Sequence, residues 1–173
     1  MLTGSYDGTA KLWDASTGTP IITLFSPASR VTSVAFSPDG TRLAYSRGRR
    51  YYDSNIWRVR ILHDRLATWA DAEQLTFDNA FIQWFDVSRD GKRLVFSSDR
   101  AGNQDLWVMP AGGGEITQLT THPTPDWNPR WSPDGAEVAF FGYRTGNREI
   151  WVMPSDGEPA RQADDVLQGE AAE

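Results

Sequence analysis

The chain has 173 residues, 39% of them hydrophobic and 23% charged, and this balance is typical of one folded domain rather than a disordered segment. Its net charge is −6 and its pI is near 4.9, which argues against nucleic acid as the main partner, because nucleic-acid binding needs a basic surface. The chain has no cysteine, which excludes disulfides, thiolate nucleophiles and cysteine-based metal sites.

No apolar run approaches the roughly 18 residues that a membrane helix needs, so we expect no membrane insertion. The first residues, MLTGSYDGTA, have neither the basic n-region nor the apolar h-region of a signal peptide. These features assign no compartment. They fit the cytoplasm at face value, and they fit the periplasm if the natural chain begins further upstream.

In residues 1–26 the sequence predicts two strands, TAKLWD and PIITLF. We interpret this segment as half of a repeat that contains only the third and fourth strands. Three longer repeats follow, each with a Ser-Pro-Asp-Gly or Ser-Arg-Asp-Gly turn, an arginine nine residues after the turn glycine and a tryptophan sixteen or seventeen residues after it. The repeated positions are Asp39, Asp90 and Asp134 in the turns, Arg49, Arg100 and Arg144, and Trp57, Trp107 and Trp151, with Trp13 as the tryptophan of the first unit.

The second repeat spans residues 27–77 and carries an inserted loop at 61–72, in which one helical turn is expected. The third and fourth repeats span 78–120 and 121–165, and an acidic tail occupies 166–173. In the fourth repeat we expect strands near 127–131, 137–141 and 149–153, and a weak strand near 158–163.

Four short strands in each repeat, several of them apolar on both faces as in EVAFF and RLVFS, predict sheets that are covered on both sides. The fold class is therefore all-β, a β-propeller arc of about three and a half four-stranded antiparallel blades. Such an arc is either a fragment of a longer propeller or half of a ring completed by a second copy. The exposed blade edges could also support self-association.

The segments GSYDGTAKLWDASTG and VTSVAFSPDGTRLAYS resemble the WD-repeat family, with Trp13 and Asp14 in the place of its name-giving dipeptide. The segment RWSPDGAEVAFFGYRTGNREIWVMPSDG resembles the WD-like repeats of TolB-type propellers. The resemblance implies a scaffold for protein–protein interaction. TolB-like repeats are also similar to the propellers of prolyl-oligopeptidase-type serine peptidases, where the propeller gates a separate catalytic domain.

A search for catalytic residues finds little in this chain. The two histidines, His63 and His122, lie in different repeats, and no Gly-x-Ser-x-Gly segment occurs. The three Asp-Gly turns each offer one carboxylate, which fits turn formation better than calcium binding. The AGGG segment at residues 111–114 is followed by a strand and not by a helix, so it is a hairpin turn and not a phosphate loop. We expect no catalytic residues, no metal and no cofactor.

The segment RGRRYYD at 47–53 breaks the repeat pattern and is the best candidate for a binding loop, because arginine and tyrosine are enriched in protein interfaces. Its alternatives are a solvated loop and a nucleic-acid contact. The repeated arginines favour structural pairing with carboxylates of the next blade over ligand recognition. Candidate binding residues in this loop and near the blade-to-blade connections are Arg47, Arg50, Tyr51, Tyr52, Trp84, His122 and Trp127.

The predicted function is therefore a non-catalytic, TolB-like propeller that binds protein partners. The alternative is the propeller part of a longer prolyl-oligopeptidase-type peptidase whose catalytic domain is not in this chain.

Overall fold

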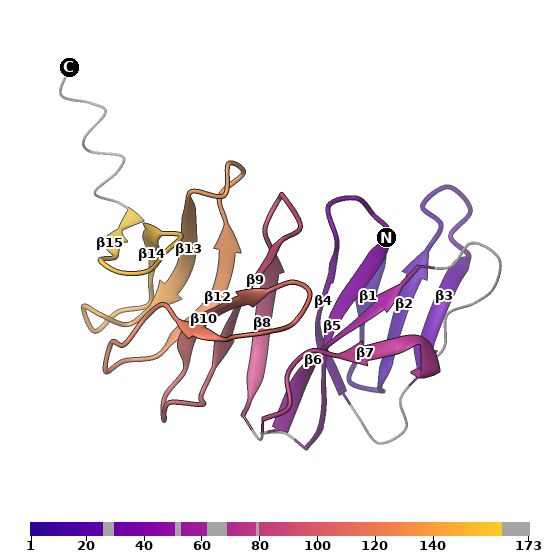
Figure 1. Ribbon diagram of the computed structural model, residues 1–173, viewed down its shortest axis with the longest axis horizontal. Coiled ribbons are helices and arrows are strands. Elements are labelled where there is room, and N and C mark those ends of the chain that lie inside the picture. Colours follow the sequence, from indigo (N-terminus) through magenta and orange to yellow (C-terminus); the bar gives the residue numbers. More distant parts are fainter. Residues whose placement is uncertain (26–29, 51–52, 62–68, 79, 164–173) are drawn as a thin grey trace. The chain divides into compact units, whose positions relative to one another are not determined.

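The computed structural model describes residues 1–25, 30–50, 53–61, 69–78 and 80–163, drawn as coloured ribbons in Figure 1. Their regular elements are β-strands, apart from a 3-10 helix at Trp69–Asp71. The chain divides into two compact units, Met1–Phe85 and Asp86–Glu173, and each is described by itself. In the described ranges, no helix is long and apolar enough to cross a membrane.

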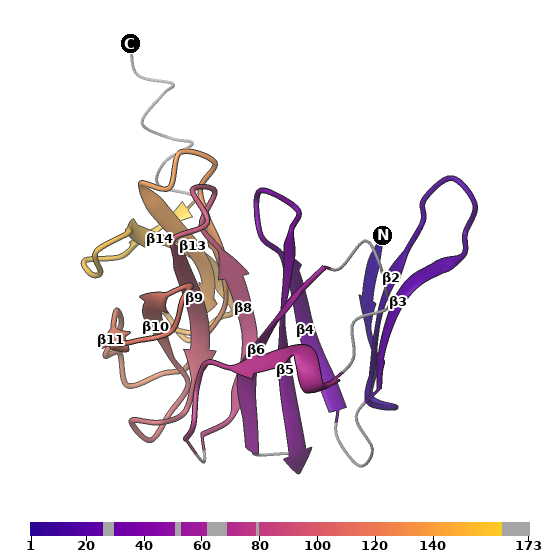
Figure 2. The same ribbon diagram turned by 45° about the vertical axis from the view of Figure 1, so that its right-hand side comes forward.

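The first sheet of the first unit has three antiparallel strands in the order β1-β2-β3. They are β1 (Leu2–Gly4), β2 (Thr9–Trp13) and β3 (Pro20–Phe25), and Figure 2 shows β2 and β3 side by side. The sequence predicted only two strands here, and β1 is the addition. Its three residues are too few to show the alternation that marks a strand in a sequence.

The second sheet of this unit has the order β4-β5-β6-β7, with β4 (Arg30–Phe36), β5 (Arg42–Arg50), β6 (Asp53–Arg60) and β7 (Ala72–Gln74). The insertion predicted at 61–72 lies between β6 and β7, and its residues 62–68 are outside the described part. The 3-10 helix ends the insertion and leads directly into β7.

Two further four-stranded sheets follow in the chain, and both have consecutive strands as neighbours. The first contains β8 (Ile82–Val87), β9 (Arg93–Ser98), β10 (Asp105–Pro110) and β11 (Thr117–Gln118), and the second contains β12 (Asp126–Trp131), β13 (Glu137–Gly142), β14 (Glu149–Pro154) and β15 (Arg161–Gln162). This pattern of consecutive antiparallel strands is that of propeller blades, which confirms the predicted fold class. The weak strand expected near 158–163 is only the two residues of β15.

The three Ser-x-Asp-Gly turns share one hydrogen-bond pattern. In each, the serine hydroxyl donates to the aspartate at 2.6 Å, and the same carboxylate oxygen accepts the backbone N–H two residues further on at 3.0 Å. The glycine has a φ of 68°, 71° or 74°, a conformation that favours glycine. The bond from serine is the main cause that lowers the pKa of Asp39 to about 2 and also lowers the pKa values of Asp90 and Asp134.

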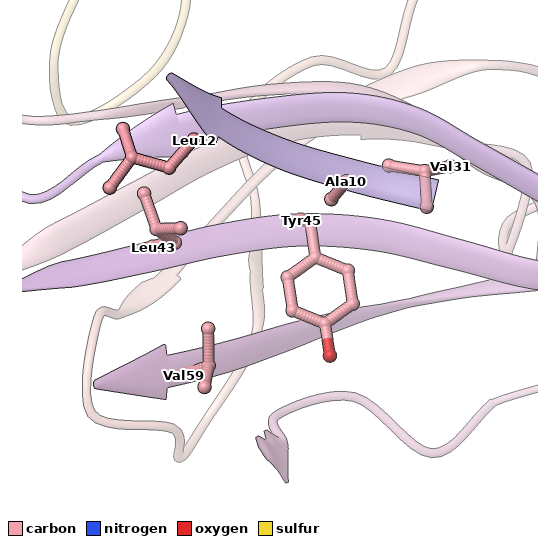
Figure 3. Close-up of a cluster of buried hydrophobic side chains, with 6 residues drawn as sticks. All are labelled: Ala10, Leu12, Val31, Leu43, Tyr45 and Val59. Atoms are coloured by element: carbon pink, nitrogen blue, oxygen red, sulfur yellow. The ribbon is translucent and has the colours of Figure 1, made fainter. Parts of the chain in front are cut away.

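Each unit has its own apolar core, built from the repeated apolar positions of the strands. In the first unit, side chains of β2, β4, β5 and β6 meet, and Figure 3 shows them as Ala10, Leu12, Val31, Leu43, Tyr45 and Val59. In the second unit, the core joins two neighbouring sheets and consists of Val95, Leu106, Leu119, Val138, Phe140 and Met153. Residues that recur in the sequence therefore recur as core residues.

Candidate binding rim

The β5–β6 hairpin is longer than the corresponding hairpins of the second unit. Pairing in β9–β10 and β13–β14 ends at Ser98↔Asp105 and Gly142↔Glu149, whereas pairing in β5–β6 continues past Arg47↔Asn55 to Gly48↔Ser54 and Arg50↔Asp53. The segment at 47–53 was predicted to be a loop, and this prediction was wrong for its described residues. They extend the two strands instead.

Gly48 is required for this extension. A Cβ atom at this position would lie 1.9 Å from the backbone oxygen of Asp53, far inside van der Waals contact. The register also shifts between Gly48 and Arg50, which marks a β-bulge in the hairpin. The close approach of the two backbones explains why the RGRR segment contains a glycine.

An arginine lies over the repeated tryptophan in each of three blades. The guanidinium carbon is 5.1 Å from the ring centroid for Arg47 over Trp57, 5.0 Å for Arg100 over Trp107 and 5.4 Å for Arg144 over Trp151. Such cation–π pairs hold the guanidinium in a defined position. From the spacing of the repeats, Arg49 was expected to be the equivalent of Arg100 and Arg144 in the second repeat, but its side chain is outside the described part. Arg47 lies over Trp57 instead, because the longer hairpin changes the spacing.

Arg144 also forms the main ion pair of the second unit. It donates from one terminal nitrogen to Asp126 Oδ2 at 2.7 Å and to Glu158 Oε1 at 2.8 Å, and from Nε to Asp126 Oδ1 at 3.4 Å. The sequence expected such arginines to pair with the next blade. Both carboxylates instead belong to the blade of Arg144 itself, one at the start of β12 and one between β14 and β15.

Two buried carboxyl groups lie near each other in the second unit. Asp126 is fully buried and Asp105 is 2% exposed. Burial, followed by the nearby charge of Asp126, raises the pKa of Asp105 to about 6. Burial likewise raises the pKa of Asp126, and the hydrogen bonds from Arg144 oppose this rise. At the register position of Asp105, the first unit has the neutral Asn55.

In the first unit, a pocket of about 260 Å³ opens at the end of the extended hairpin. Its lining combines polar and charged side chains with one indole and one glycine, and consists of Arg47, Gly48, Asp53, Asn55, Trp57 and Gln74. Thr76 holds one atom of each amide in place: its hydroxyl donates to Asn55 Oδ1 at 2.9 Å, and its backbone oxygen accepts from Gln74 Nε2 at 2.7 Å.

A second, smaller pocket lies at the same end of the sheet and is also lined by Gly48. Arg30 and Tyr6 line it too, and the Arg30 guanidinium carbon is 5.5 Å from the Tyr6 ring centroid. Arg30 is the cross-strand partner of Gly48. We refer to Tyr6, Arg30, Arg47, Asp53 and Asn55, which surround this end of the sheet, as the arginine rim.

The structure does not gather all the predicted binding residues into one site. Arg47 is in the rim, Tyr51 and Tyr52 lie outside the described residues, and only the backbone of Arg50 is described. Trp84 lies in β8 and is half-buried.

His122 and Trp127 belong to the second unit. The His122 Nδ1 atom is 2.8 Å from Thr124 Oγ1, and Trp127 packs edge-on against Tyr143 with the ring centroids 5.5 Å apart. His63 lies outside the described part. Among the described residues, no group of histidine and acidic side chains is arranged to hold a metal ion.

Sequence reasoning missed Tyr6, Arg30, Asn55 and Gln74 as residues of this end of the sheet. One signal could have found the region. Residues 30–60 contain seven arginines and two aspartates, a net charge of +5 within a chain whose net charge is −6.

Two protein-family models match this chain. A family model for the TolB beta propeller domain matches residues 12–166, and a model for the WD domain, G-beta repeat, matches residues 1–14. The chain is 36% identical over 109 residues to the "Uncharacterized peptidase YuxL" of Bacillus subtilis (strain 168), and this match covers 60% of the chain and 16% of YuxL.

Two solved structures show the same fold. TolB from Acinetobacter baumannii is similar with a TM-score of 0.74 and 19% identity, over 93% of this chain and 40% of that one. A chain of a nidogen/laminin complex is similar with a TM-score of 0.71 and 13% identity, over 93% of this chain and 60% of that one. The chain therefore spans less than two thirds of each of these relatives.

Proposed function

The chain belongs to the TolB β-propeller family, and from this premise we propose that it is a non-catalytic propeller that binds protein partners through the arginine rim. The observation that carries the proposal is the pair of arginines at one end of the first unit, each held over an aromatic ring. A guanidinium that is already held in place loses less entropy on binding. Arginine and aromatic side chains are also the residues that dominate binding energy in protein interfaces.

Site-specific photo-crosslinking in the native cells tests the proposal. A photoreactive phenylalanine analogue replaces Tyr6, which is 67% exposed in the rim, and in a matched control it replaces Phe36, which is 39% exposed at the other end of β4. Tyr6 lies beside Arg30, the first residue of β4, and Phe36 is the last residue of β4. The two ends of this strand are about 20 Å apart at 3.3 Å per residue. We expect a discrete adduct with one protein at Tyr6 and none at Phe36. No adduct at Tyr6, or equal adducts at both positions, would contradict the proposal.

A second candidate function is the gating propeller of a longer serine peptidase, and the match to YuxL favours it. Treatment of the natural gene product with a fluorophosphonate probe, which labels activated serines, distinguishes the two candidate functions. The non-catalytic proposal expects no label on residues 1–173. A labelled serine encoded beyond this segment would support the peptidase alternative, and a labelled serine within it would overturn the non-catalytic proposal.

A further inference from the structure

We propose that the arginine rim binds an acidic, extended peptide segment of its protein partner. The inference rests on the proposed function and adds the chemistry of the partner. Its first support is charge. Residues 30–60, which form β4, β5, β6 and their connections, contain seven arginines and two aspartates, whereas the whole chain has a net charge of −6. A local excess of one sign on a chain of the opposite sign selects a partner of complementary charge.

The second support is the position of the arginines. Arg47, Arg49 and Arg50 occupy the end of β5, and Arg30 begins β4 opposite Gly48. Arg42 and Arg60, which pair with each other, are at the far end of the same two strands. Four of the seven arginines are therefore concentrated at the rim end of the sheet.

The third support is the mixture of groups in the pocket beside Arg47. Its lining includes amides from Asn55 and Gln74 as well as the guanidinium, and the carboxylate of Asp53, which can only accept hydrogen bonds from the N–H groups of a peptide backbone. Amides can pair with the N–H and C=O groups of a peptide backbone, while arginines form paired hydrogen bonds with carboxylates. A peptide with acidic side chains uses both sets of groups.

Nucleic acid also carries negative charge, but it fits these observations less well. Outside residues 30–60 the chain is acidic, which disfavours the long run of phosphates that nucleic acid presents. An acidic peptide segment can be short enough to match the rim alone. Nucleic acid is therefore one of the outcomes that the experiment must distinguish.

The experiment measures binding of a fluorescent peptide of alternating glutamate and serine to the full chain by anisotropy at low salt. The test variant is Arg30→Gln with Arg47→Gln, and a second test variant, Arg49→Gln with Arg50→Gln, keeps the Arg47–Trp57 stacking intact. The matched control is Arg42→Gln with Arg60→Gln, which removes the same charge from the opposite end of the same strands. An oligothymidylate of the same net charge serves as the nucleic-acid probe.

We expect the wild-type chain and the control to bind the peptide alike, and each test variant to bind it about tenfold more weakly, the loss expected for one or two charge-assisted hydrogen bonds. Equal weakening by the control and the test pairs, tighter binding of the oligothymidylate, or no binding of the peptide to folded wild-type chain would each overturn the inference. Because photo-crosslinking at Tyr6 is independent of these probes, an adduct formed there would leave the proposed function standing even if the acidic-peptide inference failed.

Discussion

At the scale of single residues, the ion pair of Arg144 and Asp126 is a buried interaction of the second unit. The Arg144 side chain is 10% exposed and Asp126 is fully buried, so removal of the arginine leaves a buried carboxylate without its main partner. We predict that Arg144→Gln lowers the free energy of unfolding by about 3–5 kcal/mol, measured by urea denaturation. Arg161→Gln is the control.

The control breaks a pair of similar length in a different environment. Arg161 lies 2.7 Å from Glu137, but the two side chains are 45% and 39% exposed. Water screens this pair, and its loss should change the free energy of unfolding by no more than about 1 kcal/mol. Equal effects of the two substitutions would show that burial of the Arg144 pair does not matter.

Asp105 gives a prediction about pH at the same scale. Its pKa is about 6 in the folded protein, above the ordinary value of 3.8, so the folded state binds this proton more tightly than the unfolded chain does. The favourable contribution is complete below the ordinary pKa and is lost as the pH rises through the folded pKa. Asp105→Asn removes this loss and places at this position the residue that the first unit has in Asn55.

We therefore expect the free energy of unfolding of Asp105→Asn, relative to wild type, to rise by up to about 3 kcal/mol between pH 4 and pH 7. Asp134→Asn is the matched control. The pKa of Asp134 is lowered, so its contribution is lost only as the pH falls below the ordinary range, and the control should show no such rise. A flat difference for Asp105→Asn would contradict the raised pKa.

At the scale of elements, the extended β5–β6 hairpin depends on Gly48. Gly48→Ala forces the two strands apart at Asp53, and overpacking of this kind costs about 1–3 kcal/mol. We predict faster hydrogen exchange at the amides of Gly48 and Ser54 and weaker binding at the rim. Arg47→Ala, which changes the neighbouring side chain but no backbone approach, should leave this exchange slow.

At the scale of the whole molecule, each of the two units has its own core. The stability of a repeat protein is roughly the sum of contributions from each repeat and from its contacts with adjacent repeats. Met153→Ala creates a cavity in the second core, and Leu43→Ala creates one in the first. Each should cost about 2–5 kcal/mol. We expect each substitution to increase hydrogen exchange first in its own unit. Equal increases in both units would show that the cores unfold together.

The sequence predicted the blades because their signals are local. The Ser-x-Asp-Gly turns and the short apolar runs, such as Leu94–Phe96, depend on neighbours within a few positions. The resemblance to TolB-like propellers is confirmed by the family match. Strand β1 was missed because three residues are too short for such a signal.

The site was harder to predict, because its geometry depends on residues far apart in the sequence. A fixed offset from the turn glycine pointed to Arg49, but the longer hairpin brings Arg47 over Trp57. Likewise, no local pattern shows that Asp126 meets Arg144 across 18 residues. The assignment of the remaining rim and loop residues to binding stays a prediction.

The three tryptophans that lie beneath arginines also provide intrinsic fluorescent probes of the blades. Trp57, Trp107 and Trp151 each lie near a guanidinium, and a change in the position of that charge alters the emission of the indole beneath it. In variants that keep one of the three and carry phenylalanine at the other tryptophan positions, each blade would emit its own signal. Binding of a ligand at the rim should then shift the emission wavelength of Trp57 and leave the emission of Trp107 and of Trp151 unchanged.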